Sequence, residues 1–130
     1  MYDKSKSRMA TYQALSVVAP SGTKIADGEK TIEVRRWTPE ELPIRDLLIV
    51  ENEHFLHDDG ATDPDGRVVA LVDVVSVEPW REEQFDAACA SYWEPGWMAW
   101  RLENVRPVRC DVPVLAARKI YEIQANIAFI

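Results

Sequence analysis

The sequence predicts an α+β domain, built as a small β-barrel or curled mixed sheet of about five to six strands with two short helices. Three observations support this class. Strand-forming runs recur along the 130 residues, only two short segments have helical features, and the implied strand pairing joins segments that are far apart. The length suits a single domain, with residues 1–13 as a flexible N-terminal tail and residues 14–130 as the folded part.

The first half of the chain supplies three predicted strands and one predicted helix. "ALSVV", residues 14–18, is a short apolar run that stops before a proline. Ser21 is a candidate N-cap for one or two helical turns that end at Gly28. "TIEVRRW", residues 31–37, alternates between apolar and polar residues, as a half-buried strand does. "DLLIVEN", residues 46–52, is apolar on both faces and therefore predicts a central strand.

The second half begins with an irregular stretch and continues with three strands and a helix. His54 to Gly66 is acidic and contains Asp-Gly pairs, so we expect a loop. "RVVALVDVVSVEPW" predicts a long strand, in which Asp73 indicates a bulge or an inward carboxylate. "REEQFDAACASYW" predicts a short amphipathic helix with acids in its first turns. "GWMAWRLENV" and "ARKIYEIQ" predict two closing strands, separated by a loop at Pro107 and Pro113. The apolar end "NIAFI" fits either an added strand or a contact with a partner. The oligomeric state therefore stays open.

Charge is distributed unevenly along the chain. The net charge of −7 at first argues against nucleic acid, but residues 37–100 carry fifteen acids and three strong bases, so the remainder carries +5. If the two end segments meet in the fold, they form a weakly basic cleft on an acidic body. No apolar run reaches the ~20 residues of a membrane-spanning helix, and the start lacks a secretory h-region. We therefore expect a cytoplasmic protein with no membrane partner, in which Cys89 and Cys110 are reduced.

The segment "DGEKTIEVRRW" holds the candidate catalytic groups. On an extended strand Glu33 and Arg35 share one face, and Lys30, in the turn after Gly28, can swing to the same side despite its parity. A solvent-facing ion pair explains Glu33 and Arg35 equally well. The alternative is a site in which Lys30 supplies a proton, Glu33 activates water and Arg35 holds an anion.

Other residue types fit either nucleotide contacts or plain structural roles. Trp93 and Trp97 lie in a Pro-Gly turn, where an aromatic ring can stack on an exposed base, whereas Trp100 fits the core better. Ser21 can hold a phosphate at a helix N-terminus, although a cap is its simpler role. The string "HFLHDD" contains metal-ligand residues without a rigid element to fix them, so we predict no metal and no other cofactor.

Several segments taken together resemble the ASCH domain family, which belongs to the PUA-like superfamily of small RNA-associated β-barrels. The most specific motif is G-x-K-T-I-E-x-R, which begins here at Gly28 and ends at Arg35. A second motif, W-x-L-E-N-x-R-P, follows at Trp100 to Pro107, in the order that the family shows. The resemblance runs from about Ala14 to Ile123.

The resemblance implies that residues 14–130 form one ASCH barrel with a cleft lined by the motif residues. Some small bacterial members of the family hydrolyse N4-acetylcytidine with the motif lysine, others have been described as ribonucleases, and many are regarded as RNA binders. Lys30 and Glu33 are accordingly the candidate catalytic residues. The candidate contacts to a nucleoside or nucleic acid are Ser21, Lys24, Arg35, Arg36, Trp37 and Trp93.

The chain also departs from the family pattern. Relatives often carry Gln-Pro-Trp-Ala after the first strand, where this chain has no tryptophan, so Trp37 or Trp93 would supply the aromatic wall. The amidohydrolase branch has threonine where Glu33 stands, and the acidic stretch from His54 would repel a phosphate backbone if it overhung the cleft. Three functions therefore stay open. They are binding of RNA or a modified nucleoside with hydrolysis of an acylated base, ribonuclease action on single-stranded RNA, and a non-catalytic role as a reader or protein-interaction module.

Overall fold

A computed structural model describes residues 8–130 as seven strands, one α-helix and one 3-10 turn. In chain order these are β1 (Arg8–Val18), α1 (Ser21–Ala26), β2 (Ile32–Arg35), β3 (Ile44–Asn52), β4 (Thr62–Pro79), η1 (Glu82–Gln84), β5 (Met98–Arg109), β6 (Val114–Ala117) and β7 (Ile120–Phe129). A small, β-rich fold is therefore confirmed, with more strands than expected and a single α-helix in place of two. Within residues 8–130 no helix combines the length and apolar character needed to cross a membrane.

The seven strands form one mixed sheet that closes on itself in part. Their order is β2-β5-β7-β1-β3-β4-β6, and β4 also pairs with β5, so that β5, β7, β1, β3 and β4 are linked in a ring. β1 and β3 are parallel, because α1 and β2 lie between them in the chain and allow the crossover. The seam between β5 and β7 is short, with Val108 opposite Phe129 and Arg109 opposite Ala128.

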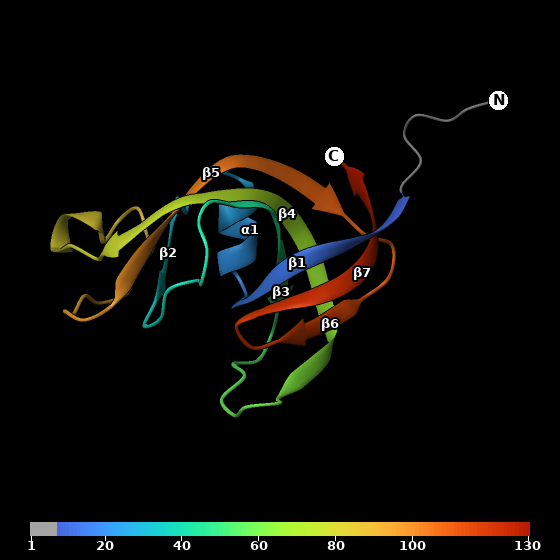
Figure 1. Ribbon diagram of the computed structural model, residues 1–130, viewed down its shortest axis with the longest axis horizontal. Helices are drawn as coiled ribbons and strands as arrows, with labels where there is room; N and C mark the ends of the chain where they lie inside the picture. Colours follow the sequence, from blue (N-terminus) through green and yellow to red (C-terminus); the bar gives the residue numbers. More distant parts are fainter. Residues whose placement is uncertain (1–7) are drawn as a thin grey trace.

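The helix lies within the curve of the two longest strands. β4 and β5 arch over α1, which also contacts β1 and β3 (Figure 1). Ile25 of α1 is fully buried in a core cluster with side chains from the ring strands. The close approach depends on Gly22, because a Cβ atom there would lie 2.8 Å from the Cβ atom of Glu51 on β3.

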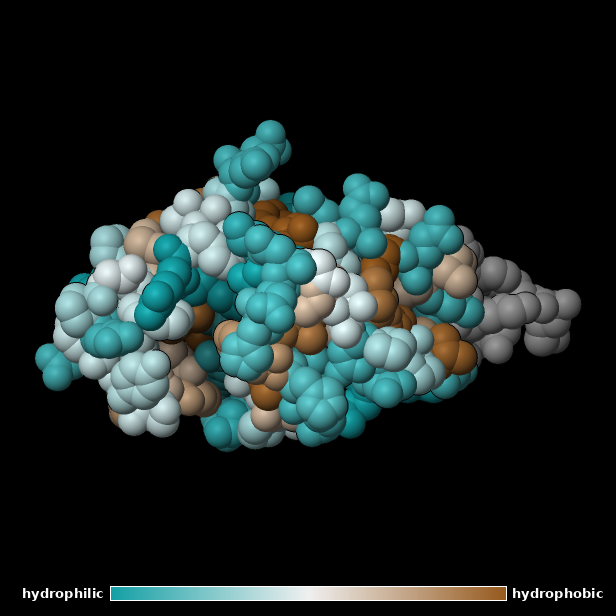
Figure 2. All heavy atoms as spheres, turned by 90° about the horizontal axis from the view of Figure 1, so that it is seen from below, coloured by the Kyte–Doolittle hydropathy of each residue, from teal (hydrophilic) through white to brown (hydrophobic). Residues whose placement is uncertain are grey.

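The core occupies both faces of β3. Leu47 and Ile49 belong to one buried cluster, whereas Leu48 and Val50 belong to a second cluster on the other face. Alternate residues of a strand point to opposite faces, so the apolar run on both faces correctly predicted a central strand. The face drawn in Figure 2 is mainly hydrophilic, and the apolar areas on it are small and separate.

Several predicted boundaries are wrong because strands extend through segments assigned to loops. Residues 8–13, predicted as tail, belong to β1 and pair with β7, while residues 1–7 lie outside the described part of the chain. β4 begins at Thr62, which shortens the irregular stretch predicted for His54 to Gly66. β5 continues through Pro107, and the segment "ARKIYEIQ" is split between β6 and β7 by a turn.

The second predicted helix is reduced to the three residues of η1. The carbonyl of Ala87 accepts hydrogen bonds from the amides of Thr31 and Ile32 at 2.9 and 3.2 Å, and the carbonyl of Ala88 accepts one from the Lys30 ammonium at 2.6 Å. These carbonyls are therefore satisfied by a distant segment. Cys89, with φ of 53°, then turns the chain out of the helical path.

Asp73 is both at a bulge and inward-facing, which are the two alternatives its sequence position suggested. The register between β4 and β5 shifts between Leu71 and Asp73. The Asp73 carboxylate is 5% exposed and accepts hydrogen bonds from the Asp46 amide at 3.0 Å, Asn104 at 3.1 Å and Arg106 at 2.9 Å. These bonds tie β3, β4 and β5 together where the ladder is interrupted.

Candidate functional site

Lys30, which precedes β2, and Glu33 and Arg35 of β2 form a connected ion triad. The Lys30 ammonium lies 3.3 Å from Glu33 Oε1, and Arg35 Nε donates to Glu33 Oε2 at 2.8 Å. Arg35 Nη2 lies 2.7 Å from the same oxygen. β2 begins only at Ile32, so the pleat does not constrain Lys30, and the structure brings together the three residues that sequence reasoning grouped.

The triad is buried, which rules out the solvent-facing ion pair considered as an alternative. The side chains of Lys30 and Glu33 are 7% and 9% exposed, and that of Arg35 is 22% exposed. Ile32 and Val34 face the opposite way and pack into a separate apolar cluster. β2 is thus covered on both faces, and its polar face lies toward the interior of a cleft.

The charges of the triad keep Glu33 ionised. Burial alone would raise the pKa of Glu33. The charges and hydrogen bonds of Arg35 and Lys30 have a larger opposite effect, so the pKa of Glu33 lies below its ordinary value. Arg35 is fixed in turn by a hydrogen bond from Nη2 to the Ser16 carbonyl at 2.8 Å. The result is a rigid carboxylate between two cations, which is a weaker proton acceptor than an isolated glutamate.

Two cavities meet at Glu33. The larger has a volume of about 600 Å³ and the smaller about 250 Å³. Glu33, Val34 and Trp97 line both cavities, whereas Lys30 lines only the smaller and Arg35 only the larger. The Glu33 side chain therefore forms part of the wall between them.

The larger cavity is strongly basic. Its charged lining consists of one carboxylate, Glu33, and four cations that come from the end of β2 and from the turn between β6 and β7: Arg35, Arg36, Arg118 and Lys119. Residues 16–18 of β1 complete this wall. The basic end segments of the sequence thus meet here, as the charge distribution predicted, although the body of the protein is acidic.

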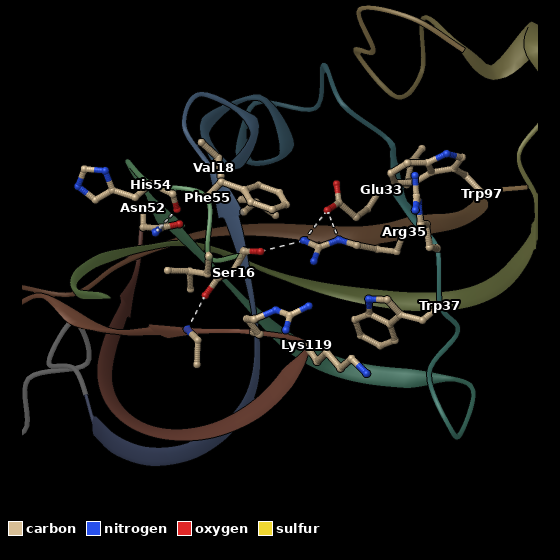
Figure 3. A pocket seen from close by; sticks show the side chains of 16 residues that line it. Ser16, Val18, Glu33, Arg35, Trp37, Asn52, His54, Phe55, Trp97 and Lys119 are labelled. Carbon is tan, nitrogen blue, oxygen red and sulfur yellow. Dashed lines mark hydrogen bonds and ion pairs between the residues drawn. The ribbon is translucent and has the colours of Figure 1, made fainter. Parts of the chain in front are cut away.

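Two tryptophans line the larger cavity, and each lies close to a cation. Arg36 Cζ lies 4.5 Å from the centre of the Trp97 ring, and Lys119 Nζ lies 5.8 Å from that of Trp37. Figure 3 shows Arg35 reaching from Glu33 toward Ser16, with Trp37 and Lys119 on one side of it and Phe55 on the other. The cavity therefore presents flat apolar walls beside concentrated positive charge.

Three predicted contact residues lie elsewhere. Ser21, Lys24 and Trp93 are absent from the linings of both cavities. Trp93 instead packs 6.3 Å from Trp80, measured between ring centres, and Lys24 lies 3.6 Å from Glu29. Their local sequence gave no indication of these packing partners.

The N-cap predicted for Ser21 is wrong, because α1 is preceded by Pro20 and has no side-chain cap. The Glu51 carboxylate, 1% exposed, accepts a hydrogen bond from the Thr23 amide at 2.8 Å. It also lies 2.7 Å from Arg67. A carboxylate from β3 already occupies the helix N-terminus where a phosphate was considered for Ser21.

The structure adds residues that sequence reasoning did not select. Trp97 was considered beside Trp93 but was not chosen, and Arg118 and Lys119 were read as part of a closing strand. The only available signal was a basic pair within "AARKI", which the structure places in a turn where Lys119 has φ of 59°. Within residues 8–130 no group of three His, Cys, Asp or Glu side chains is arranged to hold a metal, and both cysteines are free.

Comparison with known proteins identifies one family and one set of similar structures. The family model for the ASCH domain matches residues 15–110. An ASCH protein from Zymomonas mobilis, solved as a tyrosine-to-phenylalanine mutant, gives a TM-score of 0.49 at 18% identity over 75% of this chain and 73% of the other. A serine-to-alanine mutant of the Zymomonas mobilis protein gives a TM-score of 0.48 at 19% identity, over 75% of this chain and 71% of the other. A third structure, of ASCH from the same organism, gives a TM-score of 0.45 at 18% identity, over 79% of this chain and 72% of the other. The search of curated proteins finds no match to the chain.

Proposed function

The chain belongs to the ASCH domain family, and on that premise we propose that it binds RNA or a modified nucleoside in the larger cavity. The main observation behind this proposal is that four cations and two tryptophans line the larger cavity, which has a volume of about 600 Å³. This volume lies within the range of small-molecule sites. Aromatic faces stack on unpaired bases, and cations bind phosphate or base oxygens. We further propose that the five-strand ring is the barrel of a PUA-like domain.

The acidic body favours a single nucleoside or a short single strand over a long duplex. Residues 37–100 carry most of the acids, and arginines outside the cavity, such as Arg67 and Arg81, lie in ion pairs with carboxylates, whereas the cavity lining holds four cations and one carboxylate. Arg35 is held by Glu33 and Ser16, and its guanidinium is thus oriented before a ligand arrives. A base stacked on Trp97 would lie near the catalytic candidate Glu33, because both residues line both cavities.

Binding is tested by titrating ribonucleosides and short single-stranded RNA while following tryptophan fluorescence. Arg36→Gln should weaken binding about tenfold, since it removes a charged contact and the partner of Trp97. Arg101→Gln is the matched control, because Arg101 on β5 lines neither cavity. Equal affinity of both variants would contradict the assignment of the cavity.

Hydrolysis of an acylated base is the second candidate, favoured by the buried Lys30–Glu33 pair at the wall between the cavities. In this reaction water attacks the acyl carbonyl, Lys30 stabilises the oxyanion, and Glu33, although its lowered pKa makes it a weak base, is the carboxylate placed to accept a proton from the water. The carbon–nitrogen bond then breaks, and the proton passes to the departing amine, which yields a carboxylate and the free base. Both groups lie within reach of a substrate in the smaller cavity.

The catalytic proposal is tested by incubation with N4-acetylcytidine and chromatography for cytidine. Wild type should convert it, and Lys30→Met, checked for native circular dichroism, should not. Turnover by Lys30→Met would remove the catalytic assignment of Lys30. Shortening of single-stranded RNA without metal would instead indicate a ribonuclease, and binding without either reaction would indicate a reader.

A further inference from the structure

Arg118 and Lys119 stand out among the cavity cations, because they lie beyond residues 15–110 that the family model matches. Both belong to the turn between β6 and β7 and line the larger cavity. Together with Arg36 they bring three cations from two separate segments to the lining of this cavity. The family resemblance therefore supplies no role for two of these three groups.

The charges of these cations are only partly balanced. In the described part of the chain neither Arg36 nor Lys119 has a carboxylate within salt-bridge distance, and each instead lies beside a tryptophan. Arg118 forms an ion pair with Asp59, whose side chain is 99% exposed. A group with more negative charge and more oxygens than a carboxylate is the natural ligand for such a set.

The segment that carries Asp59 is held beside the cavity at its base. The Asn52 amide, 2% exposed, donates to the His54 carbonyl at 2.7 Å and to the Asp63 carboxylate at 3.2 Å. These bonds join the two ends of residues 53–62, and Phe55 within it lines the cavity. Asp59 is therefore kept within reach of Arg118, and because the ion pair is exposed to water its strength is low.

We propose that Arg36, Arg118 and Lys119 form a subsite for the phosphate of a nucleotide, and that Asp59 occupies Arg118 until the phosphate displaces it. This inference rests on the proposed function, because the nucleoside part of the ligand is assigned to the same cavity. A phosphate presents up to two negative charges to three cations, whereas Asp59 presents one charge to one cation. The acidic stretch thus acts as an internal competitor that selects for phosphorylated ligands.

Calorimetry with the full chain tests this proposal. Each of the four ribonucleosides, its 5′-monophosphate and inorganic phosphate are titrated into wild type. The nucleotide should bind about tenfold tighter than its nucleoside, and in an Arg118→Gln/Lys119→Gln double variant this ratio should fall toward one. Inorganic phosphate should bind more weakly than the nucleotide and compete with it.

The role of Asp59 has a matched control in its neighbour. Asp59→Asn should raise nucleotide affinity roughly threefold by releasing Arg118, whereas Asp58→Asn, which makes the same charge change, should raise it much less. All these side chains lie on the surface or in turns, so the variants should fold.

Equal affinities for nucleoside and nucleotide would overturn the phosphate subsite and leave the proposed function intact. Equal effects of the two aspartate substitutions would overturn the competition by Asp59. Inorganic phosphate binding as tightly as the nucleotide would show a free-anion site instead. Failure of nucleosides, nucleotides and RNA to bind would overturn the proposed function together with this inference.

Discussion

Replacing Glu33 by glutamine tests whether the buried triad stabilises the fold as a unit. The substitution keeps the shape of the side chain but leaves the Lys30 ammonium, 7% exposed, with the Ala88 carbonyl as its remaining partner among the described residues. Removing one member of a buried ion pair costs about 3–5 kcal/mol. Glutamine retains a hydrogen-bond acceptor, so we expect a loss of about 3 kcal/mol in the free energy of unfolding.

This loss corresponds to a fall in melting temperature of about 12 °C, since 1 kcal/mol shifts a domain of this size by about 4 °C. Urea unfolding followed by circular dichroism gives the free energy, and Glu29→Gln is the control, because its carboxylate is 58% exposed in a surface pair with Lys24. In a double-mutant cycle, Glu33→Gln/Lys30→Met should lose at least about 1 kcal/mol less than the sum of the single variants. A melting temperature equal to that of Glu29→Gln, or an additive cycle, would refute the reasoning.

Three further predictions follow from burial, close packing and the bulge. The pKa values of Glu33 and Glu51 lie below the ordinary 4.5, because nearby cations and hydrogen bonds outweigh the effect of burial. The stability that these carboxylates provide is therefore complete above pH 4.5 and is lost as the pH falls through their lower pKa values in the folded protein. Acid titration of the unfolding free energy should therefore be steeper for wild type than for Glu51→Gln. Gly22→Ala should cost about 1–3 kcal/mol in urea unfolding, since its Cβ would lie 2.8 Å from that of Glu51. Asp73→Ala, which removes a buried carboxylate that accepts hydrogen bonds from the Asp46 amide, Asn104 and Arg106, should lower the urea midpoint more than Asp111→Ala, whose side chain is 86% exposed.

Sequence reasoning succeeded where local periodicity carried the information. The alternation in β2 placed Glu33 and Arg35 on one face, and the apolar run of β3 identified a strand buried on both sides. Charge counted by segment also anticipated a basic cleft, because the basic segments of the chain converge on the larger cavity.

The failures share a non-local cause. Residues 85–90 have helical composition, but the carbonyls of Ala87 and Ala88 accept hydrogen bonds from the chain around Lys30, which no local pattern reveals. Trp93 and Trp97 occur in the same turn and both pack against the apolar cluster around Trp80, yet only Trp97 lines a cavity, a difference that no local pattern reveals. Arg118 and Lys119 were hidden within what reads as one continuous strand.

The pairing of β1 with β7 has a consequence for how the chain acquires its structure. β1 is the first described strand and β7 the last, yet eight residue pairs join them, from Arg8 with Ile127 to Leu15 with Ile120. During synthesis β1 must wait with one edge exposed until more than a hundred further residues have been added. Folds dominated by such distant pairings form in milliseconds to seconds, far more slowly than helical bundles. The ring can therefore close only after translation has passed β7, and the exposed edge of β1 is the segment that a nascent chain most needs to protect from aggregation.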